Sequence, residues 1–541
     1  MKEQHIVRRK KALYVLGLIV ILATPSLGFA VKRREKVEVE GTLKVQYEDG
    51  PDWQSTFYYL DTGNKEFLLD FDDHGIQLRG DGSRVRVRGV LHDDILSVEN
   101  ASSDLMSVQS STINWTGEQH TLVMLFNFQD NSGNKPWTPD FVRNLLFTTV
   151  DQFYRQASYN SVWFSGDLAG WYTIPVNSTA CSADWRTAAE NGARALGFEP
   201  NNYAHLVFVF PYSSCFNWSG LTINYFSGST ATSEVWINGY ANLKNVGHEV
   251  GHSLGFAHSN TLVCSGGVLS GTCNTTEYGD PYEIMGNTNA GDPGAVWKAG
   301  AGWFGAGQFM EVTSSGIFTL SPLESSDSNL KSIRVLQSVD ATSGQSSYYY
   351  LEFRQPLGND AFLSSYPAIT GGVLIHQGKS PTSIYATWQS NLLDMTPGTT
   401  GGNQALAAGQ NYYDSALSLR ISVDSVSSSG ATVSVTFGAA PPPPPPPPPP
   451  DTTPPTIGIS SPGNSATVTG TVSIMVNTAD NVGVTKVDLY VDGAMKATAT
   501  APPFTTKWNA KKAAGGNHVL QCDAYDAAGN RGMSTQITVR R

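Results

Sequence analysis

The sequence predicts a multidomain protein in which one α/β lobe is flanked by all-β domains, the last of which is an immunoglobulin-like β-sandwich. Short alternating apolar runs, separated by Asp, Gly and Asn turns, lie on both sides of the centre of the 541-residue chain. Helical patterns follow buried strands only in the central part. Ten consecutive prolines, Pro441–Pro450, separate residues 451–541 from everything before them. We expect a signal peptide at 1–30, a β-rich N-terminal domain at 31–115, the α/β lobe at 116–310, a β-sandwich at 311–438, a linker at 439–455 and the immunoglobulin-like domain at 456–541.

The N-terminus has the features of a secretory signal. Four basic residues at positions 8–11 precede an apolar run from Ala12 to Ala23, and small residues lead to a cleavage position after Ala30. The alternative is an uncleaved membrane anchor, but the run is short for a bilayer-spanning helix and Pro25 interrupts it. We therefore expect cleavage and a protein that is secreted to the extracellular space, the periplasm or the cell surface, with no transmembrane segment.

Residues 31–115 carry strand chemistry. Alternating runs at Val37–Val45, Phe57–Leu60 and Val85–Leu91 predict a small β-barrel or a sandwich. The segment is either a cleavable inhibitory prosegment or a permanent domain. No cysteine occurs between Ala30 and Ala180, so a thiol from this segment cannot cap a metal ion.

The central region has the pattern of an α/β lobe. Thr121–Phe128 and Leu206–Phe210 read as buried strands. Thr138 can cap a helix that has Pro139 at its first position and runs to about Gln156. The apolar side of this helix is predicted to hold Phe141, Leu145, Val150 and Phe153. A second helix is expected to begin at Ser182 or Asp184 and to end near Gly197.

After Trp303 we expect no further helices. The alternating runs in residues 311–438 predict a β-sandwich that packs against the α/β lobe. His376 lies in one of these runs, and we interpret it as a hydrogen-bonded sheet histidine in preference to a metal ligand.

The polyproline tract predicts an extended, stiff spacer of ~30 Å. The residues beyond it contain regular short strands and an Asp492-Gly493 hairpin signal, a combination typical of an immunoglobulin-like sandwich. The Asp480-Asn481 and Asp526–Asn530 turns could bind Ca²⁺, but ordinary turn chemistry explains them as well.

The five cysteines fit an oxidising compartment. Four of them lie in the central region and allow three connectivities. Among these we favour Cys264–Cys273 as a small loop and Cys181–Cys215 as a longer one. Cys522 remains, and we expect it to be a buried thiol in the last domain.

The run HEVGHSLGFAH, which begins at His248, carries the candidate site. On a helix His248 and His252 lie ~40° apart around the axis and one turn along it, so both can point at one ion. Gly255 allows a sharp turn, after which His258 returns as a third ligand. Three imidazoles with an open fourth position form the ligand set of a catalytic zinc, and the carboxylate of Glu249 can reach a water on that ion.

A bare HExxH pattern also occurs by chance on ordinary helix faces. The longer run adds a glycine and a third histidine at set offsets, which makes a zinc site the better interpretation. The remaining alternative is a degenerate site that binds metal without turnover.

This run resembles the metzincin signature, HExxHxxGxxH. Metzincins place a methionine in a tight turn beneath the zinc, and EYGDPYEIMGN at Glu277–Asn287 offers Met285. These motifs, together with SYNSVWFSGDLAGWYTIP at Ser158–Pro175, are most similar to gametolysin-like (M11) metallopeptidases over residues 120–310. The resemblance implies a metzincin-type lobe with Met285 as an apolar floor. The DTTPPTIGISSP and DAAGN segments after the prolines resemble bacterial immunoglobulin-like domains.

The sequence departs from the metzincin pattern in two places. Some metzincins use a tyrosine two residues after the turn methionine as an extra zinc ligand, but Asn287 stands there. Ser259 follows His258, where several groups have an aspartate. Tyr282, three residues before the methionine, is interpreted as a packing residue.

The resemblance and the chemistry together imply a secreted zinc metalloendopeptidase with one catalytic Zn²⁺. Zinc lowers the pKa of a bound water to ~7, and Glu249 is expected to accept its proton and later to protonate the leaving amine. The expected substrate is an extracellular, cell-wall or matrix protein that binds as an extended strand near Ser233–Asn238.

The alternative is a surface adhesin or glycan-binding protein with a vestigial protease lobe. Vestigial sites usually lose the glutamate or a histidine, and here all four residues are present, which favours the enzyme. In either case the C-terminal domain could bind a cell-surface or glycan ligand. The net charge of −11, with no basic patch beyond residue 35, argues against nucleic acid as a partner.

Overall fold

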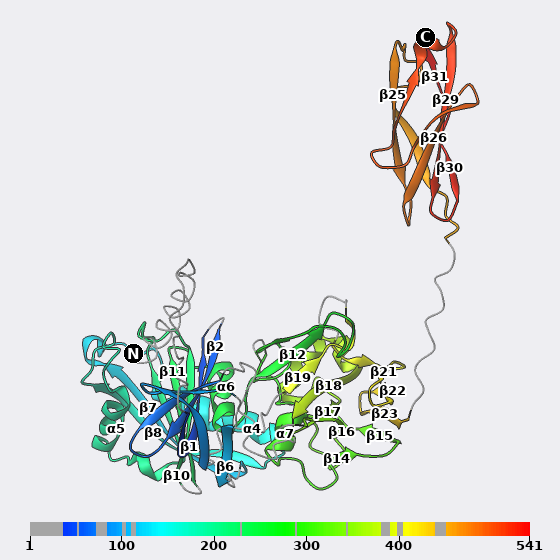
Figure 1. Ribbon diagram of the computed structural model, residues 1–541. Coiled ribbons are helices and arrows are strands. Elements are labelled where there is room, and N and C mark those ends of the chain that lie inside the picture. The colour runs from blue at the N-terminus through cyan, green and yellow to red at the C-terminus, as the bar shows by residue number, and fades with distance from the viewer. Residues whose placement is uncertain are drawn as a thin grey trace, which may run out of the picture. The chain divides into compact units, whose positions relative to one another are not determined.

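The computed structural model describes residues 36–50, 53–71, 84–99, 104–109, 115–227, 230–286, 289–341, 345–379, 390–397, 404–438 and 451–541. The signal peptide predicted at 1–30 and the prolines at 441–450 lie outside these residues. Strands take up far more of the described chain than helices do, and they form several sheets (Figure 1). The chain divides into two compact units, residues 1–441 and 442–541, and each is described by itself. No helix among the described residues combines the length and the apolar character that crossing a membrane requires.

The first strands close into a small barrel, which is one of the two architectures predicted for this segment. The strands are hydrogen-bonded in the order β1–β2–β3–β5–β4, and a further pairing of β4 with β1 closes the ring. Strand β6 pairs with β4 as well. In β4 buried and more exposed residues alternate, so that one face of the strand fills the barrel. The strands are β1 (Val37–Asp49), β2 (Gln54–Asp61), β3 (Glu66–Phe71), β4 (Arg84–His92), β5 (Ile95–Val98) and β6 (Leu105–Gln109).

Strand β1 is long enough to belong to both the barrel and a second sheet. Its first half, Val37–Thr42, pairs with β4, and its last residues, Val45–Asp49, pair antiparallel with β10. The sheet continues from β10 through β11, β9 and β7 to β8, and every pair beyond β11 is parallel. These strands are β7 (Gly117–Phe128), β8 (Val162–Ile174), β9 (His205–Phe210), β10 (Gly220–Ser227) and β11 (Thr230–Asn238).

The prediction that an extended substrate binds near Ser233–Asn238 is wrong, because it needs a sheet edge and these residues do not form one. These residues lie in β11, which has β10 on one side and β9 on the other. Their backbone groups are therefore already used in the ladder. Of the strands that residues 117–238 contribute, β10 and β8 stand at the two ends of the order, and β10 is the one that pairs with β1.

Helices cover both faces of this sheet. Thr138 caps the predicted helix by accepting a hydrogen bond from the backbone N–H of Phe141 (3.1 Å). The helix runs through α3 (Pro139–Asn144), a π-helical segment η2 (Leu145–Val150) and α4 (Asp151–Ala157). The placement of Phe141 on the buried side is wrong, since its side chain is 46% exposed. The π segment shifts the helical period, and a uniform period of 3.6 residues does not reproduce the buried face.

The opposite face is covered by α5 (Trp185–Ala195), which Asp184 caps as predicted. Side chains of α5 pack with one set of sheet residues, which includes Phe126, Phe208 and Phe210. The α3–α4 segment packs with the alternate residues of the same strands, which include Val123, Leu125 and Val209. Adjacent residues of one strand thus serve two cores, which explains why β9 is buried throughout.

A second β-rich part follows, and its strands interleave with the α/β lobe. One sheet has the order β13-β12-β19-β18-β17-β16-β14, and another the order β15-β23-β22-β21. Strands β12 and β13 belong to this part although residues 259–276 come before the predicted boundary at 310. They belong to it because β12 pairs with β19 from residues 390–393, and β13 pairs with β12. The strands are β12 (Ser259–Cys264), β13 (Cys273–Thr276), β14 (Phe309–Val312), β15 (Gly316–Leu320), β16 (Ser332–Val339), β17 (Ser346–Glu352), β18 (Gly372–Lys379), β19 (Ser390–Leu393), β21 (Asn411–Asp414), β22 (Leu419–Ser427) and β23 (Gly430–Phe437).

The expectation that no helix follows Trp303 is wrong. A 3-10 segment η4 (Gly358–Ser365) and a short helix α8 (Pro367–Thr370) stand between β17 and β18. Pro367 begins α8, where its fixed φ suits a first helical turn. The helix α7 (Ala295–Gly300) lies between β13 and β14.

The C-terminal unit is a sandwich of two sheets. One has the order β24-β25-β28, and the other has the order β27-β26-β29-β30 with β31 on β29. The predicted Asp492-Gly493 turn joins β26 to β27, and both residues have a positive φ (51° and 77°). Cys522 is buried between the sheets, as predicted. The strands are β24 (Thr456–Ser461), β25 (Thr471–Ala479), β26 (Val484–Val491), β27 (Ala494–Ala499), β28 (Thr505–Asn509), β29 (Asn517–Asp526), β30 (Arg531–Met533) and β31 (Ile537–Arg540).

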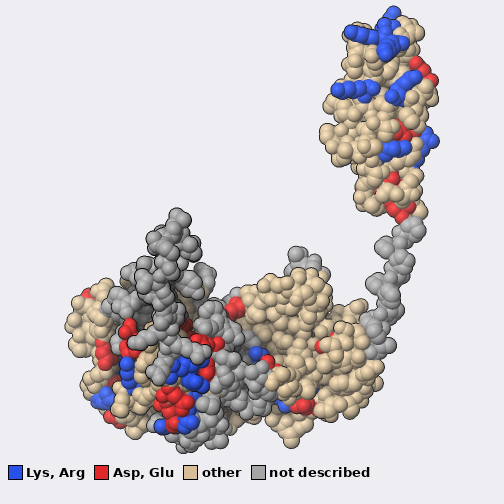
Figure 2. All heavy atoms as spheres, in the orientation of Figure 1, with Lys and Arg blue, Asp and Glu red and all other residues tan. Residues whose placement is uncertain are grey.

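Charged side chains gather on the barrel. Figure 2 shows both signs side by side there, whereas the face visible over β14–β23 is largely uncharged. On the barrel Glu40 of β1 forms ion pairs with Arg84 (2.7 Å) and Arg86 (3.2 Å) of β4. These exposed pairs join the two strands that close the barrel, and solvent screening makes each of them weak.

Both favoured disulfides are present. Cys181 is bonded to Cys215 across 34 positions of sequence, and Cys264 is bonded to Cys273 across 9. The second bond joins opposed residues of β12 and β13.

Removal of either disulfide is expected to lower the free energy of unfolding, by an amount that rises with the logarithm of the length of the loop that it closes. We expect a loss of about 4 kcal/mol for the Cys181→Ser/Cys215→Ser protein and about 3 kcal/mol for the Cys264→Ser/Cys273→Ser protein, because the longer loop restricts the unfolded chain more. Urea unfolding of the two proteins measures both losses. A larger loss for the shorter loop would contradict this account.

Candidate metal centre

The three histidines are brought together by one helix and the turn that follows it. Helix α6 (Leu243–Ser253) begins at Asn242, whose side chain accepts a hydrogen bond from the backbone N–H of Asn245 (3.0 Å). His248 and His252 lie one turn apart on its buried face. Gly255 then takes a φ of +83°, which ends the helix and returns His258 to the same place.

The Nε2 atoms of the three imidazoles converge. Those of His252 and His258 are 3.1 Å apart, and all three side chains are at most 5% exposed. Each Nδ1 atom has an oxygen partner: Ile284 O for His248 (2.8 Å), Phe256 O for His252 (2.7 Å) and Glu277 Oε1 for His258 (2.8 Å). A ring that donates from Nδ1 keeps a lone pair on Nε2, so the three lone pairs face a common centre.

A fourth side chain enters this centre from the N-terminal barrel. Asp49, the last residue of β1, has Oδ2 3.2 Å from Nε2 of His252 and 3.5 Å from that of His248, and Oδ1 3.1 Å from that of His258. The four residues form a buried group that could hold a metal ion.

The sequence offers no local signal for Asp49, which lies 203 positions before His252. Tyr278 was missed as well, although it stands in the segment that carries Met285. Its hydroxyl donates a hydrogen bond to Asp49 Oδ1 and lies 3.3 Å from His248 Nε2, and its ring stacks on His258 with centroids 4.0 Å apart.

Glu249 lies beneath β10. Its Oε2 accepts a hydrogen bond from the hydroxyl of Thr222 (2.6 Å), and its side chain is 1% exposed. Burial raises its pKa well above the usual value, and the negative charge of Asp49 raises it further. Gly220 leaves the space for this carboxyl group, because a Cβ atom there would lie 1.9 Å from Glu249 Oε1.

Met285 is fully buried and packs against α6. A Cβ atom at Gly251 would lie 2.4 Å from its sulfur, so this glycine allows the close approach. Lys244 of α6 donates to the carbonyl oxygens of Ile284 (2.7 Å), Asn289 (3.1 Å) and Gly286, and so fixes the methionine turn. Tyr282 is a buried packing residue whose hydroxyl donates to Gln404, as predicted. Asn287 lies outside the described residues.

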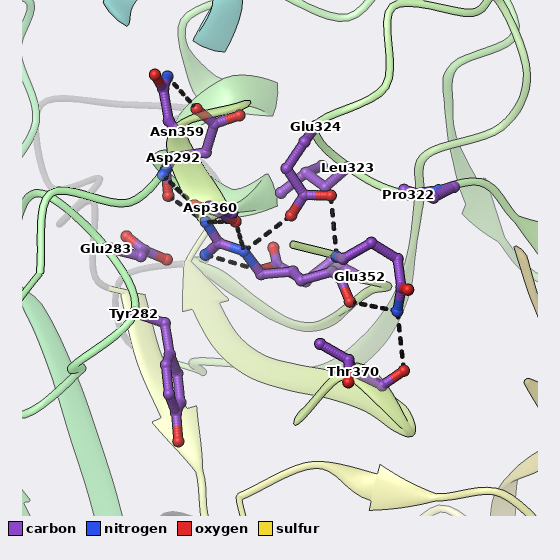
Figure 3. A network of polar contacts seen from close by, with 12 residues as sticks. Tyr282, Glu283, Asp292, Pro322, Leu323, Glu324, Glu352, Asn359, Asp360 and Thr370 are labelled. Atoms are coloured by element: carbon purple, nitrogen blue, oxygen red, sulfur yellow. Dashed lines mark hydrogen bonds and ion pairs between the residues drawn. The ribbon is translucent and has the colours of Figure 1, made fainter. Parts of the chain in front are cut away.

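A network of buried charges ties the methionine turn to the second β-rich part (Figure 3). Arg354 lies at its middle and donates to Asp360 Oδ2 (2.7 Å) and to the carbonyl oxygen of Asp292 (2.7 Å). Glu283 and Glu352 lie close by in the same view. All five side chains are at most 1% exposed, so the network is a fully desolvated contact between segments far apart in the sequence.

His376 is a buried sheet histidine, as predicted, and lies outside the three-histidine group. From β18 its Nε2 atom contacts Asp280 Oδ2 (3.0 Å), on the loop that leads to Met285. It therefore helps to hold the methionine turn in place.

The two turns considered for calcium lie together in the C-terminal unit. Asp480 and Asp526 form with Asp451 a group whose oxygen atoms could hold a metal ion. The turn chemistry is present too, since Asp480 accepts from the backbone N–H of Gly483 (2.7 Å) and Asp526 from that of Asn530 (2.8 Å). Calcium there stays a prediction.

Comparison with known families gives two matches. A model described as gametolysin peptidase M11 matches residues 120–391, just over half of the chain. One described as bacterial Ig domain matches residues 455–521, which confirms the prediction for the last domain. No curated protein matches the sequence.

Several solved structures are similar over parts of the chain. The fibronectin(III)-like modules of Clostridium thermocellum CbhA are 25% identical over 16% of this chain and 93% of theirs, with a TM-score of 0.15. OgpA from Akkermansia muciniphila is 11% identical over 80% and 95%, with a TM-score of 0.18. The endo-beta-1,4-mannanase from Thermotoga petrophila is 12% identical over 17% and 20%, with a TM-score of 0.14. TM-scores this low carry no argument about the site.

We expect the unfolding free energy of the first unit to fall as the pH rises from about 6.5 to about 9. Burial lowers the pKa of His376, but the carboxylates of Glu352, Asp280 and Glu283 raise it more, to about 9. Because this pKa is above the unfolded value, the protonated ring stabilises the fold fully below about pH 6.5, by up to about 3 kcal/mol, and the gain is lost as the pH passes 9. Urea unfolding across this range checks it. His376→Gln should reduce the decline, and an unchanged decline would contradict the assignment.

Proposed function

Because the chain belongs to the gametolysin peptidase M11 family, we propose that this metallopeptidase is a secreted zinc-dependent endopeptidase with a metzincin-type lobe. The observation that carries the proposal is the convergence of three Nε2 atoms beside a buried glutamate. His248, His252 and His258 would hold the metal ion, and Glu249 would handle the protons.

The donor set fits zinc. Three imidazole nitrogens are ligands that zinc prefers, and catalytic zinc sites have three protein ligands and one further position. The partners on Nδ1 fix each ring and its tautomer, as in other zinc sites. When bound, zinc would polarise the scissile carbonyl group and lower the pKa of a water molecule.

Glu249 is placed to move protons between that water and the leaving amine. Glu249 comes directly after His248 on the helix, and consecutive helix residues point in directions about 100° apart. Its carboxyl group therefore lies on the side of β10, whereas the imidazoles face the centre. The hydroxyl of Thr222 donates to Oε2 of Glu249 (2.6 Å), and Asp49 is a second side-chain hydrogen-bond neighbour of this carboxyl group. Burial and the charge of Asp49 raise the pKa of Glu249, which favours the uptake of a proton by this carboxyl group.

The substrate would be an extracellular, cell-wall or matrix protein. An extended peptide would pair with β10, the strand whose Thr222 contacts Glu249, on the side that β1 occupies in this structure. A cell-surface or glycan ligand for the immunoglobulin-like unit would then bring the enzyme to its substrate. The buried and hydrogen-bonded state of all four motif residues supports an enzyme in preference to an adhesin with a vestigial lobe.

Two substitutions should separate metal binding from proton transfer. Glu249→Gln should keep one zinc per chain and lower casein hydrolysis by ~10²–10⁴-fold, whereas His252→Ala should lose both metal and activity. Metal analysis and a casein assay measure the two effects. Both variants are also tested in chains with Asp49→Ala, because Asp49 contacts the imidazoles. Normal hydrolysis by Glu249→Gln would contradict the assigned role.

Gly220→Ala should impair the site without touching a metal ligand. Its Cβ atom would meet Glu249 Oε1 at 1.9 Å, so the carboxyl group must move. We expect a loss of about tenfold or more in kcat at unchanged zinc content, since misplacing a proton carrier raises the barrier. Gly170→Ala is the matched control, because no atom lies within 4 Å of a Cβ there. Equal activity of the two variants would contradict the packing argument.

A further inference from the structure

Strand β1 covers the strand that a bound peptide would use. Val45–Asp49 pair in register with Gly220–Asn224 of β10, on the side opposite to β11. The contact continues at the end of β1, where the backbone N–H of Ser219 donates to the carbonyl oxygen of Asp49 (2.7 Å) and its hydroxyl donates to the same oxygen (2.9 Å). Over these residues β10 therefore has no unpaired side, and an extended peptide and β1 exclude each other.

The side chains of β1 reach the histidines. Alternate residues of a strand point the same way, so Tyr47 and Asp49 share one face. The ring of Tyr47 stacks on His252, with centroids 4.1 Å apart and planes 5° from parallel. It also meets the ring of His258 edge-on at 6.1 Å. Tyr47 is 4% exposed, so β1 seals this side of the centre against water.

The carboxylate of Asp49 has the position of a metal ligand. Its oxygens face the three Nε2 atoms at 3.1 to 3.5 Å, and the four residues offer ligand atoms that all lie within 4.8 Å of one another. Each Nδ1 atom is engaged elsewhere, so imidazole lone pairs and carboxylate lone pairs meet at one centre. Electron-rich atoms crowd in this way around a cation, and three nitrogens with one carboxylate oxygen complete a tetrahedral zinc shell.

We propose that the β1–β2 hairpin holds the enzyme latent: Asp49 fills the fourth position on the metal ion, and β1 fills the peptide-binding edge at β10. This inference rests on the proposed function. It assigns the barrel the role of an internal inhibitor whose metal-binding group is a carboxylate. Residues 31–115 contain no cysteine that could bind the metal ion in its place. Activity then requires that the hairpin leave β10, which frees the fourth position and the edge together.

The test uses the full chain loaded with Co²⁺, whose visible absorption reports the number and type of its ligands. The parent carries Glu249→Gln so that it does not digest itself. It is compared with chains that add Asp49→Ala, Asp49→Asn or, as the matched control, Asp61→Asn. Asp61 is an exposed carboxylate at the end of β2 that lies farther from β10 along the hairpin. The probe is acetohydroxamate, a small bidentate metal ligand.

The proposal predicts one spectrum for the parent and the Asp61→Asn chain and a different one for both Asp49 variants. Acetohydroxamate should bind Co²⁺ in the Asp49 variants at least about tenfold more tightly, because in the parent it must first displace the carboxylate. In chains that keep Glu249, Asp49→Ala should raise the hydrolysis of a short fluorogenic peptide by about tenfold or more. The isosteric Asp49→Asn chain, together with a thermal unfolding curve for each variant, separates loss of the ligand from loss of the fold.

Equal spectra and equal probe affinities in the parent and both Asp49 variants would overturn the latent state while leaving the metal centre intact. Failure of every chain to bind Co²⁺ or Zn²⁺ would instead remove the proposed metallopeptidase and this inference with it. The two failures are therefore distinct.

Discussion

The candidate site depends on the hydrogen bonds that fix the far side of each imidazole. His248 is held by a carbonyl group of the methionine turn, His252 by the carbonyl group at the end of its own helix, and His258 by Glu277. An imidazole that is free to rotate about its side-chain bonds points its second nitrogen in no fixed direction. The convergence of the three Nε2 atoms therefore follows from the placement of a helix, a turn and a loop together.

Close packing around α6 makes this placement rigid. Gly220 and Gly251 admit Glu249 and the sulfur of Met285 to within distances that any larger side chain would block. The methionine turn is held in turn by the second β-rich part, through Arg354 and the acids around it. Such a buried network adds little net stability, but the loss of one member leaves charges unpaired, so it fixes the turn in one position. Strand β12, which begins directly after His258, also belongs to the sheet of that second part, so the same part holds the chain on both sides of the site.

Local features of the site were predictable from the sequence, and distant ones were not. The spacing of His248 and His252 and the positive φ of Gly255 follow from residues within one run of the chain, because helical period and glycine backbone freedom act locally. Asp49 and Tyr47 reach the same centre through a strand pairing across more than 170 positions. No local pattern specifies which strand β1 joins. The pairing of β12 with β19 could not be predicted from the sequence for the same reason.

The most direct measurement of the central claim is an anomalous-difference map at the zinc absorption edge, from crystals of the full chain prepared with zinc. The account predicts one strong peak about 2.0–2.1 Å from the Nε2 atoms of His248, His252 and His258, with an oxygen of Asp49 completing the shell. A map without a peak at this centre, or with the imidazoles turned away from the ion, would contradict it.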